Sequence, residues 1–290
     1  MPGVDINRTT TNVVLPEEVS AEIWAKALDE SAIMQLARKI NIPGTGIKIQ
    51  TITGEPVAEW VGETESKPVS THTFGQKVIT PYKMAFIEPF SNEFRRDKAA
   101  LYAECVNRAP KALGRLFDET VQGTTAPGSG FDTLGGAQTV SLTPSGSGTV
   151  YDQFLAADAL ISAAGGIMDG IGLAPQGKSK VLAAVDGQNR PLFTAGVSSD
   201  SIQPILGAPV KVAKGLYVQG SPNTVGLAGD FESAVWGSVE GIQIAISDQA
   251  TLVHNGETIN LWQQNMFAVR FEMEVAFAVE DINKFVLLTD

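Results

Sequence analysis

The sequence predicts an α+β fold built from antiparallel strands and a small number of amphipathic helices. Residues 267–279 alternate large apolar side chains with small or charged ones, which is the period of a β-strand. Residues 97–121 place apolar side chains three and four positions apart, which is the period of an α-helix. Helices and strands do not alternate regularly along the chain, so parallel βαβ units are not expected.

Composition and charge narrow the class of protein. The chain has 290 residues, 43% of them hydrophobic and 18% charged, which is typical of a globular protein with a large core. The formal net charge of −11 argues against a broad basic face that grips nucleic acid, because phosphate binding needs clustered Lys and Arg. A single cysteine, Cys105, permits no intramolecular disulfide and is expected to be a small buried residue.

The N-terminal region predicts an arm followed by a helix. Residues 1–15 are polar and unpatterned, without the basic start and apolar run of a signal peptide, and suit an arm that lies on a neighbouring subunit. Pro16 fits a first helical turn, and apolar residues then recur at helical spacing as far as residues 29–31. Residues 33–42 carry a second apolar segment, and no stretch approaches the ~20 apolar residues of a membrane helix.

Residues 43–94 predict a long two-stranded excursion, with its turn near Ser66 to Pro68. Such a hairpin is marginal alone in water, so we expect it to pack on something outside its own subunit. Trp60 suits either an interface hot spot or local packing at the hairpin base. The candidate residues for intersubunit contact are one tryptophan and several charged side chains: Trp60, Glu59, Glu63, Glu65, Lys67 and Lys77.

The clearest helix is expected at residues 97–121. Pro110 predicts a bend or a division into two pieces, and Gly123 lies where a C-terminal cap is expected. Residues 123–148 are rich in Gly, Ser, Thr and Pro and predict a long loop. The main apolar stripe of the helix is Leu101, Cys105, Ala109, Ala112 and Leu116, broadened by Val106, Leu113 and Phe117.

The remaining elements are shorter. Tyr151 to Ala164 predicts a helix, and Phe285 to Leu288 a last apolar segment. Residues 229–232 predict a turn before Val235. Short strands are expected at residues 180–185, 210–213, 225–228 and 242–246.

The sequence carries no motif for catalysis or for cofactor binding. Its two histidines, His72 and His254, lie far apart, and no Cys or His occurs at metal-ligand spacing. Neither a nucleophile motif of the G-x-S-x-G type nor a glycine-rich phosphate loop is present. We therefore expect no catalytic, cofactor-binding or metal-binding residues, and no cofactor.

The order of elements resembles the major capsid proteins of tailed bacteriophages, whose fold is shared with encapsulin nanocompartments. The resemblance covers nearly the whole chain, from Leu15 to Leu288. The segments that carry it are short but follow one another in the family's order: residues 41–44, 58–63, 80–84, 91–93, 116–119 with Gly123, 206–210 and 229–231.

The resemblance implies a phage major-capsid-type fold with a definite layout. An N-terminal arm is implied at residues 1–15 and an extended E-loop hairpin at residues 45–90. A peripheral domain, which includes the long spine helix, is implied at residues 16–44, 91–149 and 266–290. An axial domain is implied at residues 150–265.

The implied function is structural, without enzymatic activity. A major capsid (head) protein of this family self-assembles into pentamers and hexamers that form an icosahedral shell around packaged double-stranded DNA, without sequence-specific binding. The implied partners are further copies of the chain, portal and scaffolding proteins and decoration proteins, with no membrane. The implied location is the virion capsid, assembled in the bacterial host cytoplasm.

Three alternatives remain open at this stage. An encapsulin-type nanocompartment shell would have the same fold and would enclose an enzyme. A phage tail-tube subunit would form rings or tubes and would lack the long helix. A hydrolase on an α+β scaffold is disfavoured by the missing motifs.

Overall fold

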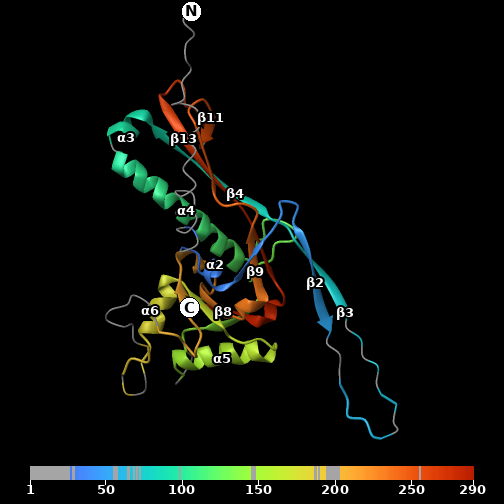
Figure 1. Cartoon of the computed structure of the whole chain (residues 1–290). Helices are drawn as coiled ribbons and strands as arrows, with labels where there is room; N and C mark the ends of the chain where they lie inside the picture. The colour runs from blue at the N-terminus through green and yellow to red at the C-terminus, as the bar shows by residue number, and fades with distance from the viewer. Residues whose placement is uncertain are drawn as a thin grey trace, which may run out of the picture.

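A computed structural model describes most of the chain and assigns its secondary structure (Figure 1). The predicted arm at 1–15 and most of the helix predicted at 16–31 lie outside the described residues. Inside two strands and one helix, the side chains of residues 51–54, 73–74, 99–107 and 109 are also not described. The described residues are 27, 30–54, 58–63, 66–67, 69, 71, 73–97, 99–144, 148–185, 188, 190–193, 203–254 and 256–290.

The first sheet is organised around one long strand, β13 (Met266–Val279), which confirms the strand predicted there. Its first ten residues pair antiparallel with β4 (Tyr82–Ser91). On its other side it pairs antiparallel with β10 (Gln243–Ser247) and then with β9 (Ala234–Ser238). The short strand β1 (Arg38–Asn41) lies parallel to β9 and completes the sheet.

The long helix α4 (Ala99–Gln122) packs on one face of this sheet and confirms the predicted spine helix (Figure 1). It is continuous through Pro110, and the short helix α3 (Asn92–Asp97) precedes it in the chain. A division at Pro110 is therefore wrong. Proline removes one backbone donor, but the rest of the helix is packed against the sheet.

The face of α4 that enters the core differs from the main stripe predicted from the sequence. Leu113, Phe117 and Val121, spaced by four residues, are buried against β13. Ala112 and Leu116, which belong to the predicted main stripe, are exposed. The two stripes are adjacent on the helix surface, and the larger aromatic side chain selects the one that faces the sheet.

The two faces of β13 are buried to different extents. The side chains from Phe267 to Val279 at alternate positions are all buried beneath α4 and its neighbours. On the opposite face, Ala276 and Ala278 are covered by a small second core, whereas Arg270 is exposed. The strict alternation in the sequence therefore reflects one fully covered face and one half-covered face.

A second sheet forms the other body of the molecule (Figure 1). Helices α5 (Val150–Ala163) and α6 (Pro175–Leu182) contribute to its separate core. The helix predicted at 151–164 and the strands predicted at 210–213 and 225–228 are confirmed. The strand order is β5 (Gln138–Ser141), β14 (Phe285–Thr289), β8 (Thr224–Gly229), β6 (Gly170–Leu173) and β7 (Val210–Val212).

Short elements connect these bodies and extend from them. The helix α2 (Ala32–Leu36) lies against α4, and 3₁₀ turns mark the corners of the chain. Two hairpins project from the sheets. The 3₁₀ turns are η1 (Lys214–Leu216), η2 (Phe231–Ser233) and η3 (Ile282–Lys284); the hairpins pair β2 (Ile47–Gly54) with β3 (Thr73–Ile79) and β11 (Thr251–His254) with β12 (Glu257–Asn260).

Two expectations about individual elements are wrong. The strand predicted at 180–185 is instead the end of α6, which begins with Pro175 in its first turn. Gly177 lets that helix approach β8, because a Cβ there would lie 2.5 Å from the Val225 carbonyl oxygen. The excursion predicted to run to residue 94 ends as a two-stranded ribbon at Ile79, because the alternating apolar side chains of β4 pack beneath α4.

The sheets also cross the boundary expected at residues 265/266. β10 lies before that boundary but pairs with β13, which lies after it. β14 lies after the boundary but pairs with β8, which lies before it. A division by sheets therefore places residues 234–279 largely in the first body and residues 285–289 in the second.

Candidate assembly surfaces

The β2–β3 ribbon is the most extended feature of the molecule. Its strands pair antiparallel from Ile47 opposite Ile79 to Gly54 opposite Thr73, and the ribbon points away from both bodies (Figure 1). Near its root, Ile47, Ile49 and Ile79 pack into the small core on the second face of β13. The root is thus buried while the rest of the ribbon lies beyond the subunit's own core.

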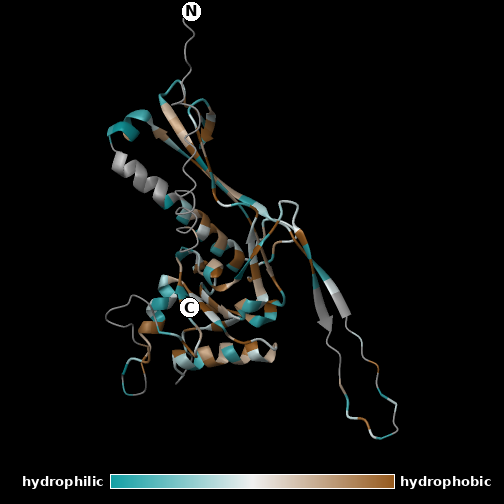
Figure 2. Ribbon diagram, in the orientation of Figure 1, coloured by the Kyte–Doolittle hydropathy of each residue, from teal (hydrophilic) through white to brown (hydrophobic). Residues whose placement is uncertain are grey.

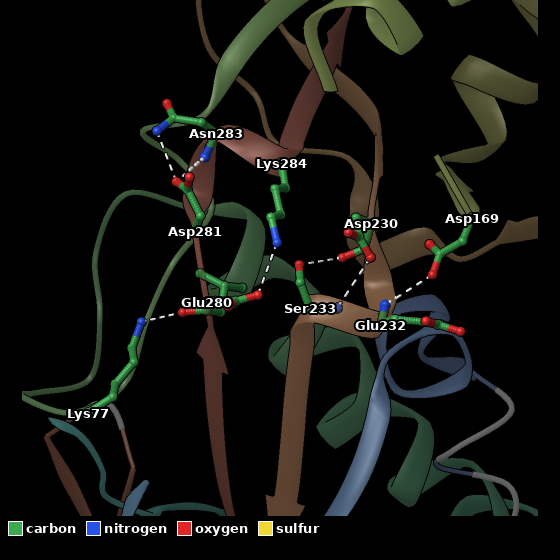
Figure 3. A network of polar contacts seen from close by, with 10 residues as sticks. Lys77, Asp169, Asp230, Glu232, Ser233, Glu280, Asp281, Asn283 and Lys284 are labelled. Carbon is green, nitrogen blue, oxygen red and sulfur yellow. Dashed lines mark hydrogen bonds and ion pairs between the residues drawn. The ribbon is translucent and has the colours of Figure 1, made fainter. Parts of the chain in front are cut away.

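Lys77 anchors the ribbon root to the end of β13, and Figure 3 shows its side chain reaching towards this point. Its Nζ lies 2.5 Å from Asp132 Oδ2 and also donates to the Val279 carbonyl oxygen. The same carboxylate accepts the Val279 N–H at 2.8 Å. These contacts are within one subunit, and a contact of Lys77 with a neighbour stays a prediction.

A network of acidic residues continues from this anchor into the second body (Figure 3). Lys284 pairs with Glu280 at 3.0 Å, and this hydrogen bond raises the pKa of Lys284. The Asp169 carboxylate accepts the backbone N–H groups of Phe231 and Glu232 at the start of η2, while partial burial raises its pKa. Asp169 precedes β6 of the second sheet, and the turn that it caps leads from β8 of that sheet to β9 of the first. The contact therefore helps to fix the connection between the two bodies.

The residues beyond the ribbon strands are exposed wherever they are described. Trp60 has a relative exposure of 105%. The interpretation that it packs locally at the hairpin base is therefore wrong. Glu59, Glu63 and Lys67 are exposed beside it, and Glu65 lies outside the described residues. A large aromatic side chain surrounded entirely by water is unusual in a folded protein and is typical of an interface residue.

The uncovered face of the first sheet is charged. Lys83 Nζ lies 3.2 Å from Glu274 and 3.5 Å from Glu272, and Arg270 Nε lies 3.2 Å from Glu272. The hydrogen bond to Glu274 raises the pKa of Lys83. Figure 2 shows polar colouring on this part of the long strands, next to the apolar positions that face α4. These partly exposed pairs keep this face hydrated.

A second exposed apolar group lies at the end of the first sheet away from the second body (Figure 1). The β11–β12 hairpin exposes Val253 at 74%, and Trp262 follows it at 71%. Asn265 begins the return into β13 and is held by Asn92 and Glu93 of α3. The sequence reading missed this hairpin because its strands are only four residues long.

A buried carboxylate joins the N-terminal segment to α4. Asp118 is fully buried and accepts the Ser31 hydroxyl at 2.6 Å and the backbone N–H groups of Ala32 and Ile33 at 3.0 and 3.3 Å. Burial raises its pKa to about 7, against the lowering effect of these hydrogen bonds. Close packing continues one turn earlier at Gly114, where a Cβ would lie 2.5 Å from the Ala27 carbonyl oxygen.

The part of the chain that the structure describes offers little for metal chemistry or membrane insertion. No group of three or more His, Cys, Asp or Glu side chains among them is placed to hold a metal ion. No helix in that part of the chain is long and apolar enough to cross a membrane. His254 is exposed on β11, and His72 lies outside the described residues.

Comparison with known proteins identifies relatives along almost the whole chain. The model of the phage capsid family matches residues 11–290. The "Probable major capsid protein gp17" of Mycobacterium phage D29 is 31% identical over 95% of this chain and 90% of its own length.

Solved structures with the same fold also come from phages and related particles. A chain of Mycobacterium phage Ogopogo superposes with a TM-score of 0.74 at 19% identity, covering 90% of this chain and 92% of its own. The capsid of a native GTA particle superposes with a TM-score of 0.65 at 14% identity, covering 98% and 93%.

Proposed function

This chain belongs to the phage capsid family and is a structural shell protein, and on that premise we propose how it assembles. Copies of the chain form pentamers and hexamers, which close into an icosahedral shell around double-stranded DNA. The observation that carries this proposal is the β2–β3 ribbon, whose exposed end includes Trp60 and has no cover within its own subunit. An element of this kind is stabilised when it lies on a neighbour.

The two bodies suggest a division of roles that follows the sheets. The first sheet with α4 would be the peripheral domain, and the second sheet with α5 and α6 the axial domain. Residues 45–79 would be the E-loop and residues 1–15 the arm. This assignment moves β10 to the peripheral domain and β14 to the axial domain, because the strand pairing joins them there. The β11–β12 hairpin, a separate two-stranded sheet, follows β10 along the chain.

The proposed partners follow from the family and from the charge. Portal, scaffolding and decoration proteins would contact the shell, which is assembled in the bacterial host cytoplasm. The enclosed DNA would be held without sequence-specific binding, since a net charge of −11 disfavours tight contact with phosphates. We propose no catalytic role and no cofactor for this chain.

Electron microscopy of the purified full chain after size-exclusion chromatography tests this proposal. Closed isometric shells, or free pentamers and hexamers, are the expected result. Shells that contain a protein cargo in place of nucleic acid would favour the encapsulin-type alternative, and tubes would favour the tail-tube alternative. A monomer at high protein concentration would contradict the proposal.

A further inference from the structure

The sequence contains the dipeptide Asn-Gly once, at Asn255–Gly256. This dipeptide readily loses the asparagine amide group without any enzyme, because glycine has no side chain to hinder attack by its own backbone nitrogen. The reaction requires the local backbone to rearrange, so its rate in a folded protein depends on how firmly the surrounding segment is held. The structure around residues 251–260 therefore decides whether this site reacts.

The dipeptide lies between the strands of the β11–β12 hairpin. Asn255 itself is outside the described residues, whereas its neighbours on both sides are described. His254 pairs with Glu257, so two residues connect the strands. Gly256 has a φ of +84°, and a Cβ built on it would meet nothing within 4 Å. Gly256, which supplies the attacking nitrogen, is therefore in open surroundings.

Little holds this hairpin closed. Among the described strands, β11 and β12 pair only with each other and join neither five-stranded sheet. Each strand has four residues, and no described residue from 251 to 260 is buried. Figure 1 shows β11 at the end of the molecule away from the second body. A hairpin of this size is marginal in water, so it opens at little cost in free energy.

Another dipeptide of the same chemical kind is locked by comparison. Aspartate followed by glycine can form the same cyclic product, and Asp169–Gly170 has this sequence. The Asp169 carboxylate accepts the backbone N–H groups of Phe231 and Glu232 at 2.7 and 3.0 Å. Gly170 is buried in β6, where a Cβ would lie 2.7 Å from the Phe231 ring. Reaction there would require the second sheet to open, whereas reaction at Gly256 requires only the hairpin to open.

We propose that Asn255 is a site of spontaneous deamidation in the folded subunit. The backbone nitrogen of Gly256 loses its proton to water and attacks the side-chain carbonyl carbon of Asn255. The new C–N bond closes a succinimide ring, and the bond to the side-chain nitrogen breaks to release ammonia. One water molecule then opens the ring at either carbonyl and leaves aspartate or isoaspartate at position 255. Nothing is oxidised or reduced, and water is the only co-reactant.

Both products alter the tip of the hairpin. Each adds a negative charge beside Glu257 and close to Val253, which is 74% exposed. Isoaspartate also lengthens the main chain by one carbon atom, which is incompatible with the tight connection between His254 and Glu257. The added charge raises the cost of burying the apolar side chains nearby. This inference goes beyond the proposed function and does not depend on it, because it needs only the dipeptide and the hairpin.

Peptide mass spectrometry tests the proposal. The full chain is incubated at pH 8, either folded or unfolded in urea, and conversion of amide to acid is followed at each asparagine. An isoaspartyl methyltransferase detects the isoaspartate product. In the folded protein we expect modification at position 255 at a rate within about tenfold of the rate in the unfolded chain, because opening the hairpin costs little.

Two other asparagines in the same peptides serve as internal controls. Asn260 accepts the Gln263 N–H at 3.2 Å, and Asn265 is bonded to Asn92 at 2.9 Å. Both precede residues with large side chains, which hinder ring closure, so both should stay unmodified while Asn255 reacts.

The matched variant is Gly256→Ala, whose Cβ has space but hinders attack by the backbone nitrogen. It should slow the reaction at position 255 in urea as well as in the folded protein. Three outcomes would overturn the inference: reaction in urea but none in the folded protein, equal modification at Asn260, or an undiminished rate in Gly256→Ala.

Discussion

The buried carboxylate of Asp118 makes the stability of the subunit depend on pH in an unusual direction. Burial raises its pKa from 3.8 to about 7, so the folded state binds the proton more tightly than the unfolded chain. The stabilisation is fully present below pH 3.8 and is lost as pH rises to about 7. At 1.36 kcal/mol for each unit of pKa, this group alone reduces the free energy of unfolding by about 4 kcal/mol across that range.

The substitution Asp118→Asn tests this reasoning. The amide can donate to the Ser31 hydroxyl and accept the Ala32 N–H, but the Ile33 N–H then loses its acceptor, at a cost of about 1–3 kcal/mol. Because Asn does not titrate, the variant should lose the pH dependence assigned to this group. It should be less stable than the original protein at pH 4 and closer to it, or more stable, at pH 8.

Urea unfolding of dissociated subunits between pH 4 and 8 measures both effects. The matched control is Asp152→Asn, because Asp152 is an exposed helix-capping carboxylate whose pKa is lowered by the Thr149 backbone N–H. Its contribution to stability is lost only as pH falls below 3.8, so this control should leave the pH dependence between pH 4 and 8 unchanged. Parallel stability curves for the original protein and Asp118→Asn would refute the assignment.

Three further substitutions test the packing of the core and the ribbon root. Trp236→Phe removes an indole N–H that donates to a backbone carbonyl of α2 at 3.1 Å, and should lower the free energy of unfolding by about 2–3 kcal/mol in urea titrations. Gly114→Ala should destabilise by about 1–3 kcal/mol despite the better helix propensity of Ala, because its Cβ would meet the Ala27 carbonyl oxygen; thermal unfolding measures this. Lys77→Met removes the partner of Asp132, and should change stability by only about 1 kcal/mol while reducing the yield of shells in electron micrographs.

Matched controls separate these effects from general damage. Gly241→Ala adds a Cβ with nothing within 4 Å and should leave the melting temperature unchanged. Trp262→Phe changes a tryptophan that is 71% exposed and should leave subunit stability unchanged. Equal losses in Trp236→Phe and Trp262→Phe, or a more stable Gly114→Ala, would contradict the packing described for α2 and α4.

The longest elements could be predicted because their patterns extend over many residues. The alternation in β13 and the helical spacing in α4 each repeat often enough to exclude the other period. The apolar run before residue 185 is too short for that distinction, so its pattern predicts a strand where α6 ends. Local patterns also do not reveal pairing partners, so the position of β14 between β5 and β8 could not be read from the sequence.

The functional surfaces were only partly predictable for a related reason. The ribbon and Trp60 stand out in the sequence because polar strand-like residues surround a large aromatic one. Asp118 does not stand out, because one acidic residue in a helix usually faces water. The sequence signal for its role is Ser31, a residue type that often precedes a helix. Ser31 hydrogen-bonds to Asp118 across 87 positions of the chain, and local patterns do not reveal such a contact. Ala112 and Leu116 are apolar and spaced by four residues, which predicts a buried stripe. The helix surface that meets the sheet is set by tertiary contacts that the sequence does not show, and both residues are exposed.

The position of β14 has a consequence for synthesis of the protein on the ribosome. Residues 285–289 form an interior strand of the second sheet, with β5 on one side and β8 on the other. That sheet cannot be completed until these residues leave the exit tunnel, long after residues 138–141 and 224–229 have emerged. Nascent chains are therefore expected to expose apolar strand edges late in translation, when the second sheet still lacks its interior strand. Premature termination before residue 285 should yield insoluble fragments rather than subunits that compete for places in the particle.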